Sequence, residues 1–273
     1  MGQTEREQTI KALCKEAGTS NIEEALRILS NRTRLSLRFP PHSYTTLDLS
    51  FLKSLSNLKI KSLEICSAKV NDLTPLKSLS NLKSLKIELT KISDLTPLQA
   101  LSNLKKLILF VNQIIEFPSL ASLSNLEELK LHGNQVVDLT LLQGLSSLKK
   151  LSLMYNKISN LTSLTSLSNL EQLYLDENQI SDLTPLQSLS KLKFLNLNKN
   201  QISDLTPLQS LSKLKKLYLN KNQISDLTPL QSLSKLKKLY LYENQISDLT
   251  PLQSLSQLEE LYLGRIIFGG KSN

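Results

Sequence analysis

The sequence contains few of the residues on which several common classes of protein depend. It has 273 residues, with no Trp and only two Cys, two Met and two His. Two cysteines cannot hold together a chain of this length, so a disulfide scaffold is excluded. No stretch approaches about 18 consecutive apolar residues, so the sequence predicts no membrane-spanning helix.

The N-terminal residues do not resemble a secretory signal, because they lack a run of roughly 7–15 apolar residues. We therefore expect a cytoplasmic protein whose two thiols are reduced. A trimmed leader, and export by a route that uses no leader, remain alternatives.

Leucine, in contrast, accounts for 65 of the 273 residues. A chain so rich in one large apolar residue is not expected to be disordered. Average proteins use the amino acids far more evenly. The excess therefore indicates a repeat in which leucine occupies fixed positions.

A unit of 22 residues, LxxLxLxxNxIxDLTPLxxLxx, recurs nine times in register. One unit cannot bury its leucines alone, whereas stacked units share a continuous core. The predicted organisation has four parts. They are an N-terminal helical cap at 1–31, an irregular first repeat at 32–59, the nine repeats at 60–257, and a terminal strand with a short tail at 258–273.

Each position of the unit, numbered from its first Leu, has a predicted structural role. The two leucines of LxL share one face of a short strand, and the residue between them lies on the other face. In DLTPL, Thr can cap a short helical turn, Pro suits its first position, and the Asp carboxylate can accept backbone N–H bonds. The Asn at position nine is expected to bond the backbone where the chain leaves the strand. We interpret the Asn and Asp columns as structural, since one carboxylate per repeat lacks the dense spacing of a calcium site.

The repeated unit resembles the leucine-rich repeat family, and in particular bacterial internalins and the related phosphatase-regulator proteins. The resemblance implies an α/β solenoid: a horseshoe with a concave parallel β-sheet and convex 3-10 turns. It also implies a protein that binds other proteins through the concave face. A regulatory subunit of an enzyme such as a phosphatase is an alternative that the same resemblance suggests.

Both ends of such a stack need to be covered. At the N-terminus, Thr4–Glu7 and Ser20–Glu23 fit the Ser/Thr-x-x-Glu capping box, and each precedes an apolar stripe of helical spacing. We predict two short helices that cover the first strand, with a membrane-active or effector helix pair as the alternative. At the C-terminus, Ile266, Ile267 and Phe268 beside an open strand edge predict a weak homodimer.

Positions five and seven are expected to face outward on the concave sheet, and they vary between repeats. Six of the seven tyrosines fall on predicted strand segments, and only Tyr44 lies elsewhere. Aromatic side chains are enriched where proteins bind one another, although Tyr also suits strands for structural reasons. The predicted partner-binding residues are Phe110, Met154, Tyr155, Tyr174, Phe194, Lys216, Tyr218, Lys238, Tyr240, Tyr242 and Tyr262.

The net charge of +9 leaves a second partner class open. Lysines concentrate in the C-terminal half beside the tyrosines, a combination that suits an acidic protein or single-stranded nucleic acid. Acidic residues such as Glu171 and Asp176 interrupt any continuous basic track, which disfavours nucleic acid.

The sequence offers little for catalysis. His132 is the one histidine expected on the concave face, and no Cys or second His accompanies it at metal-ligand spacing. Cys66 lacks a neighbouring pattern that marks an activated nucleophile. We therefore predict a non-enzymatic recognition or scaffold module without cofactor or metal.

Overall fold

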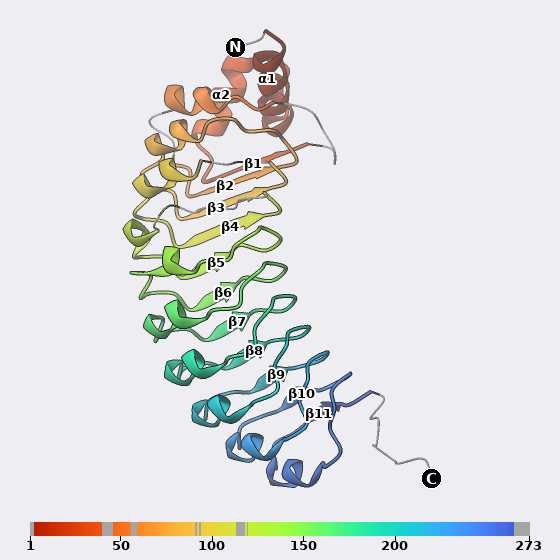
Figure 1. The fold of residues 1–273 in the computed structure, drawn as a ribbon. Helices are drawn as coiled ribbons and strands as arrows, with labels where there is room; N and C mark the ends of the chain where they lie inside the picture. The colour runs from red at the N-terminus through yellow and green to blue at the C-terminus, as the bar shows by residue number, and fades with distance from the viewer. Residues whose placement is uncertain are drawn as a thin grey trace. The chain divides into compact units, whose positions relative to one another are not determined.

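The protein is described here from a computed structural model, which describes residues 3–39, 46–55, 59–90, 92, 94–112, 118 and 120–264. The chain divides into two compact units, Met1–Gln135 and Val136–Asn273. Each unit consists of stacked repeats, and each is described by itself (Figure 1).

Two helices open the first unit, α1 (Gln3–Ala17) and α2 (Ile22–Ser30), and α1 packs against the first strand (Figure 1). They bury Leu13 and Leu29, which are 1% and 0% exposed. The predicted helical cap is thus confirmed.

The residue that begins α2 differs from the prediction. Asn21 caps the helix, and its Oδ1 atom accepts hydrogen bonds from the backbone N–H groups of Glu23 and Glu24 at 2.8 and 3.1 Å. The prediction that Ser20 caps this helix is wrong. Asn is as good a cap as Ser, and the helix begins one residue later. The side chain of Thr4 lies outside the described residues.

The strands of each unit pair in parallel and in chain order, with partners one repeat apart, as in Leu63 with Leu85. The first unit contains β1 (Arg34–Arg38), β2 (Ser62–Cys66), β3 (Ser84–Glu88), β4 (Lys106–Phe110) and β5 (Glu128–Lys130). The second contains β6 (Lys150–Ser152), β7 (Gln172–Tyr174), β8 (Phe194–Asn196), β9 (Lys216–Tyr218), β10 (Lys238–Tyr240) and β11 (Glu260–Tyr262).

Short 3-10 turns follow the strands and complete the solenoid architecture that the repeat predicts (Figure 1). They are η1 (Leu49–Leu55), η2 (Thr74–Ser78), η3 (Thr96–Ala100), η4 (Ala121–Leu123), η5 (Thr140–Leu142), η6 (Thr162–Ser166), η7 (Thr184–Ser188), η8 (Thr206–Ser210), η9 (Thr228–Ser232) and η10 (Thr250–Ser254).

The Asp of DLTPL holds the start of each turn as predicted. Asp182 Oδ1, for example, accepts a hydrogen bond from the backbone N–H of Thr184 at 2.8 Å. The predicted cap by Thr is wrong, because Leu183 occupies the cap position without a side-chain bond and Thr184 already lies in the turn. The carboxylate two residues earlier reaches the free N–H group instead.

The Asn column bonds the backbone of two neighbouring repeats, which confirms its predicted role. Asn200 Nδ2 donates to the carbonyl oxygens of Leu175 and Leu197 at 3.0 and 3.1 Å. Its Oδ1 accepts from the N–H of Ile180 at 3.0 Å. The leucines around this column are 0% exposed. Hydrogen bonds from buried Asn side chains to the backbone fix the register of neighbouring repeats, whose core consists almost wholly of leucine.

Two features bear on the predicted partners. No described helix is both long and apolar enough to cross a membrane.

All three residues of β11 are exposed, but residues 265–273 lie outside the described residues. The homodimer through Ile266, Ile267 and Phe268 therefore stays a prediction.

Candidate functional site

Six aromatic rings form a continuous row on the second unit. Their contacts run from Tyr174 to Phe194 (4.6 Å between ring centroids), Phe194 to Tyr218 (5.2 Å), Tyr218 to Tyr240 (4.4 Å), Tyr240 to Tyr262 (5.8 Å) and Tyr262 to Tyr242 (6.0 Å). We call this set the aromatic row. We call the sheet face that carries it, opposite to the leucine core, the open face.

Strand register explains the row. Tyr218, Tyr240 and Tyr262 occupy position five of successive repeats and are direct neighbours across β9, β10 and β11. Parallel strands lie about 4.8 Å apart, so side chains at the same position meet. The rings of Tyr218 and Tyr240 are stacked, with an angle of 15° between their planes.

Phe194 keeps the row continuous where position five is not aromatic. In β8 that position is Asn196, which pairs with Tyr174 and Tyr218 on the neighbouring strands. Phe194 lies two residues earlier on the same face, and its ring contacts both tyrosines. The sequence predicts that each of these residues belongs to the binding face, but it does not predict that their rings touch. Phe194 is at position three and the tyrosines are at position five, so their contact depends on the orientation of the side chains.

Three of the predicted residues lie apart from the row. Phe110 ends β4 in the first unit, where its ring lies 5.4 Å from that of His132. Met154 follows β6 in the second unit and has no ring contact in the row. Tyr155 lies in a bend after β6 with φ at 55° and is 45% exposed.

The prediction that Tyr155 belongs to a strand segment is therefore wrong. Position eight adopts left-handed backbone throughout the described repeats, from Ser67 to Glu243. This conformation turns the chain away from the strand direction. Tyr242, at position seven, also lies beyond its strand, but its ring still reaches Tyr262.

Lysines flank the row on the side where the strands begin. Lys216 and Lys238 hold position three of β9 and β10. Lys238 pairs with Glu260, whose other oxygen accepts a hydrogen bond from the Tyr240 hydroxyl at 3.1 Å. Lys150 lies 5.4 Å from the ring centre of Tyr174, which is within range of a cation–π interaction.

A buried carboxylate lies next to the row, although the sequence indicates only a surface acid at this position. Asp176, at position seven after β7, is 8% exposed and accepts a hydrogen bond from Asn196 Nδ2 at 2.9 Å. Burial raises the pKa of Asp176 to about 6. One signal could have found it: the next two repeats carry neutral Asn198 and Asn220 at the same position.

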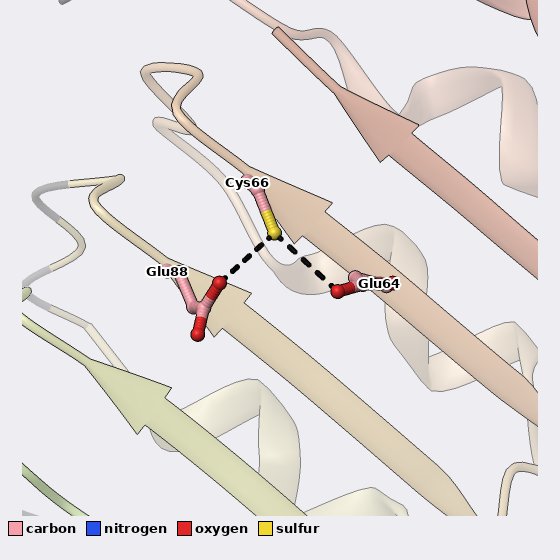
Figure 2. Close-up of side chains that lie close together, drawn as sticks. All are labelled: Glu64, Cys66 and Glu88. Atoms are coloured by element: carbon pink, nitrogen blue, oxygen red, sulfur yellow. Dashed lines mark hydrogen bonds between the residues drawn. The ribbon is translucent and has the colours of Figure 1, made fainter. Parts of the chain in front are cut away.

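The open face of the first unit carries charges instead of rings. Figure 2 shows Cys66 between Glu64 and Glu88, with Sγ 3.7 Å from Glu64 Oε1 and 3.3 Å from Glu88 Oε2. Lys86 Nζ lies 2.9 Å from an oxygen of each carboxylate. Burial alone raises the pKa of Glu64, but hydrogen bonds from Lys86 and Arg38 outweigh it and lower the pKa to about 2.

This cluster has donor atoms within 4.8 Å of one another, a spacing that suits a metal ion. Lys86, however, already bridges both carboxylates, so a metal ion would have to displace a bound ammonium group. A metal ion also requires a thiolate, whereas burial and the hydrogen bond to Glu88 raise the pKa of Cys66 to about 12. The geometry is that of an ion-pair network.

The thiol of Cys66 is expected to be unreactive. With its pKa moved from 9.0 to about 12, the thiolate fraction at pH 8 falls about a thousandfold. Alkylation by iodoacetamide at pH 8, followed by peptide mass spectrometry, should therefore be slower at Cys66 than at a free thiol by a comparable factor. Glu88→Gln should accelerate it at least about tenfold, whereas Glu127→Gln should not. Equal rates in both variants would contradict the assigned cause.

The repeats match a known family. The family model described as "Leucine Rich repeats (2 copies)" matches residues 102–144, 146–188, 190–232 and 234–267. These matches span more than half of the chain, and the chain therefore belongs to the leucine-rich repeat family. A search of curated proteins found no match.

Solved structures from bacteria and a plant share the fold. An internalin from Listeria monocytogenes is 24% identical, with a TM-score of 0.64 over 93% of this chain and 94% of that one. A leucine-rich repeat protein from Leptospira interrogans is 22% identical, with a TM-score of 0.62 over 90% and 75%. The ectodomain of a plant receptor kinase from Arabidopsis thaliana is 24% identical, with a TM-score of 0.72 over 88% and 31%. These likenesses confirm the predicted internalin-like repeat fold.

Membership of this family carries a general function. Leucine-rich repeat domains are protein–protein interaction modules, and those of internalin type are typically non-enzymatic.

Proposed function

We propose that the second unit binds a partner protein through the aromatic row. The observation that carries this proposal is the unbroken series of ring contacts from Tyr174 to Tyr262 on the open face. The hydrophobic core does not require these rings, because buried leucines already fill the opposite side of every strand. Large, rigid aromatic side chains lose little conformational entropy when a partner covers them.

The fold family supports a protein as the partner. The plant receptor ectodomain was solved in complex with CASPARIAN STRIP INTEGRITY FACTOR 2. In this chain, Lys216 and Lys238 flank the row and would attract a partner of opposite charge during encounter.

The orientation of the rings favours a protein over single-stranded nucleic acid. Nucleic-acid bases bind aromatic side chains by stacking on open ring faces. The stacked rings of Tyr218 and Tyr240 cover each other's faces, and Phe194 meets Tyr218 edge-on.

The double variant Tyr218→Ala with Tyr240→Ala should reduce partner capture at least about thirtyfold, since two interface tyrosines each contribute on the order of 1–2 kcal/mol. The measurement is affinity capture from the native source with quantitative mass spectrometry. Loss of the stacked pair should lower the free energy of unfolding only by about 1–2 kcal/mol, so thermal unfolding will show a folded protein.

Tyr155→Ala is the matched control, because Tyr155 is an exposed tyrosine of the same unit outside the row. Its capture should equal that of the unmodified protein. Unchanged capture by the double variant would remove the aromatic row as the binding site.

A further inference from the structure

We propose that the partner is an acidic polypeptide segment whose carboxylates bind at Lys216 and Tyr218 while its apolar side chains cover the aromatic row. This inference rests on the proposed function and specifies the chemistry of the partner. Three observations on the open face carry it.

The first observation is what the row presents outward. Because the faces of Tyr218 and Tyr240 cover each other, the ring edges and the Tyr218 hydroxyl remain for a partner. The edge of an aromatic ring is electropositive, and a phenol hydroxyl donates a hydrogen bond. Such a surface favours carboxylate oxygens and carbonyl oxygens over cationic groups.

The second observation is a carboxylate that already binds in this way within the chain. Glu260 accepts a hydrogen bond from the Tyr240 hydroxyl and pairs with Lys238. Hydrogen bonds from Lys238 and then from Tyr240 lower the pKa of Glu260. A lysine at position three and a tyrosine at position five therefore form a carboxylate site in this fold.

The third observation is that the same pair recurs one repeat earlier without its carboxylate. Lys216 and Tyr218 stand in register with Lys238 and Tyr240 on the neighbouring strand. The residue at position three of the next strand is Lys238 and not Glu. Lys216 therefore has no carboxylate directly opposite it and attracts Glu260 only at longer range. Within the described part of the chain, Lys216 forms no salt bridge and the Tyr218 hydroxyl no hydrogen bond.

The charge around this position strengthens the preference for an acid. Lysines dominate positions two and three of β8 to β10, whereas the repeats immediately before and after carry acids at these positions. The lysines are Lys193, Lys215, Lys216, Lys237 and Lys238. Lys238 is already paired with Glu260. A partner carboxylate would therefore meet the ammonium group of Lys216 and the hydroxyl of Tyr218, a charge-assisted arrangement.

The test uses three fluorescein-labelled peptides of 15 residues, measured by fluorescence anisotropy with the full chain. Each alternates the same Leu, Tyr and Pro residues with one variable residue, which is Glu, Gln or Lys. The Glu peptide should bind at least about tenfold more tightly than the Gln peptide, and the Lys peptide most weakly. Tighter binding of the Gln or Lys peptide, or of oligothymidylate, would overturn the inference, as would no saturable binding of the Glu peptide up to about 1 mM.

Point variants locate the effect. Lys216→Gln and Tyr218→Phe should each reduce the preference for Glu over Gln about three- to tenfold and leave the affinity for the Gln peptide unchanged. Lys213→Gln is the matched control, because Lys213 lies in the turn before β9 and should have no effect. An equal preference in all three variants would overturn the site.

The same peptides separate this inference from the proposed function. If the Glu and Gln peptides bind equally and Tyr218→Ala with Tyr240→Ala abolishes both, the aromatic row binds proteins but does not select acids. If that double variant changes the affinity of no peptide, the proposed function itself fails.

Discussion

Replacing Asn200 with Ala is expected to lower the free energy of unfolding by about 3–5 kcal/mol, the largest effect of a single substitution that we predict. The Asn200 side chain satisfies three buried backbone groups, which are the carbonyl oxygens of Leu175 and Leu197 and the N–H of Ile180. It also donates to the partly buried carbonyl oxygen of Asn198. It is only 9% exposed. Alanine leaves these groups without a partner in a leucine core, and each unsatisfied buried group costs on the order of 1–3 kcal/mol.

Urea unfolding followed by circular dichroism measures this effect. Asn169→Ala is the matched control, because its Nδ2 also donates to a carbonyl of the preceding repeat, that of Ser146 at 2.8 Å, but at the surface. Water can replace that bond, so the control should lose less than about 1 kcal/mol. A loss for Asn200→Ala no larger than that of the control would show that the Asn column does not stabilise the stack.

The strands and turns of the repeated unit are predictable from the sequence because the same residue pattern recurs many times. Asn200 and its equivalents stand at one position in seven of the nine units, so their common role follows from position alone. The Asp of each DLTPL turn is predictable for the same reason. In contrast, Asn21 and Ser20 compete for a single helix start that occurs once, and nothing in the sequence decides between two good caps.

The candidate site is predictable in composition but not in arrangement. Tyr218 and Tyr240 sit at the same position of two repeats, so their contact follows from register. Phe194 reaches Tyr174 from a different position, and only its side-chain orientation makes the row continuous. The residue type of Tyr155 predicts the same role as for the other tyrosines, yet the left-handed backbone at position eight places it outside the row.

The aromatic row and the ion-pair network of Glu64 show that the same repeat carries different side chains on the open faces of the two units. Both lie at the variable positions of the open face, and the leucines beneath them are the same. In the first unit, Glu64 is surrounded by Arg38 and Lys86 and its charge is satisfied internally. In the second unit, Lys216 has no such ion pair within the described residues, and we propose that it binds a partner together with Tyr218. Variation between repeats therefore carries more functional information than the repeat itself.

Asp176→Asn is expected to raise the free energy of unfolding at pH 7 by about 2 kcal/mol. Burial raises the pKa of Asp176 from 3.8 to about 6 in the folded protein. A shift of this size corresponds to at most about 3 kcal/mol, and access of water to the open face reduces it. Asn fits this position, because Asn198 and Asn220 occupy it in the next two repeats and accept hydrogen bonds from the backbone of the following repeat.

The pH dependence identifies the cause. Because the folded state holds the proton more tightly than the unfolded state, the charge of Asp176 destabilises the fold above pH 6, and stability is regained as the pH falls from about 6 to 4. The advantage of Asp176→Asn should therefore be full at pH 7.5 and vanish near pH 4 in urea unfolding. Asp182→Asn is the control with the opposite sign, since hydrogen bonds from Thr184 lower the pKa of Asp182. Its effect should be small, because Asn160 serves the same turn in another repeat. A pH-independent gain for Asp176→Asn would show that the charge of the buried carboxylate is not what destabilises the open face.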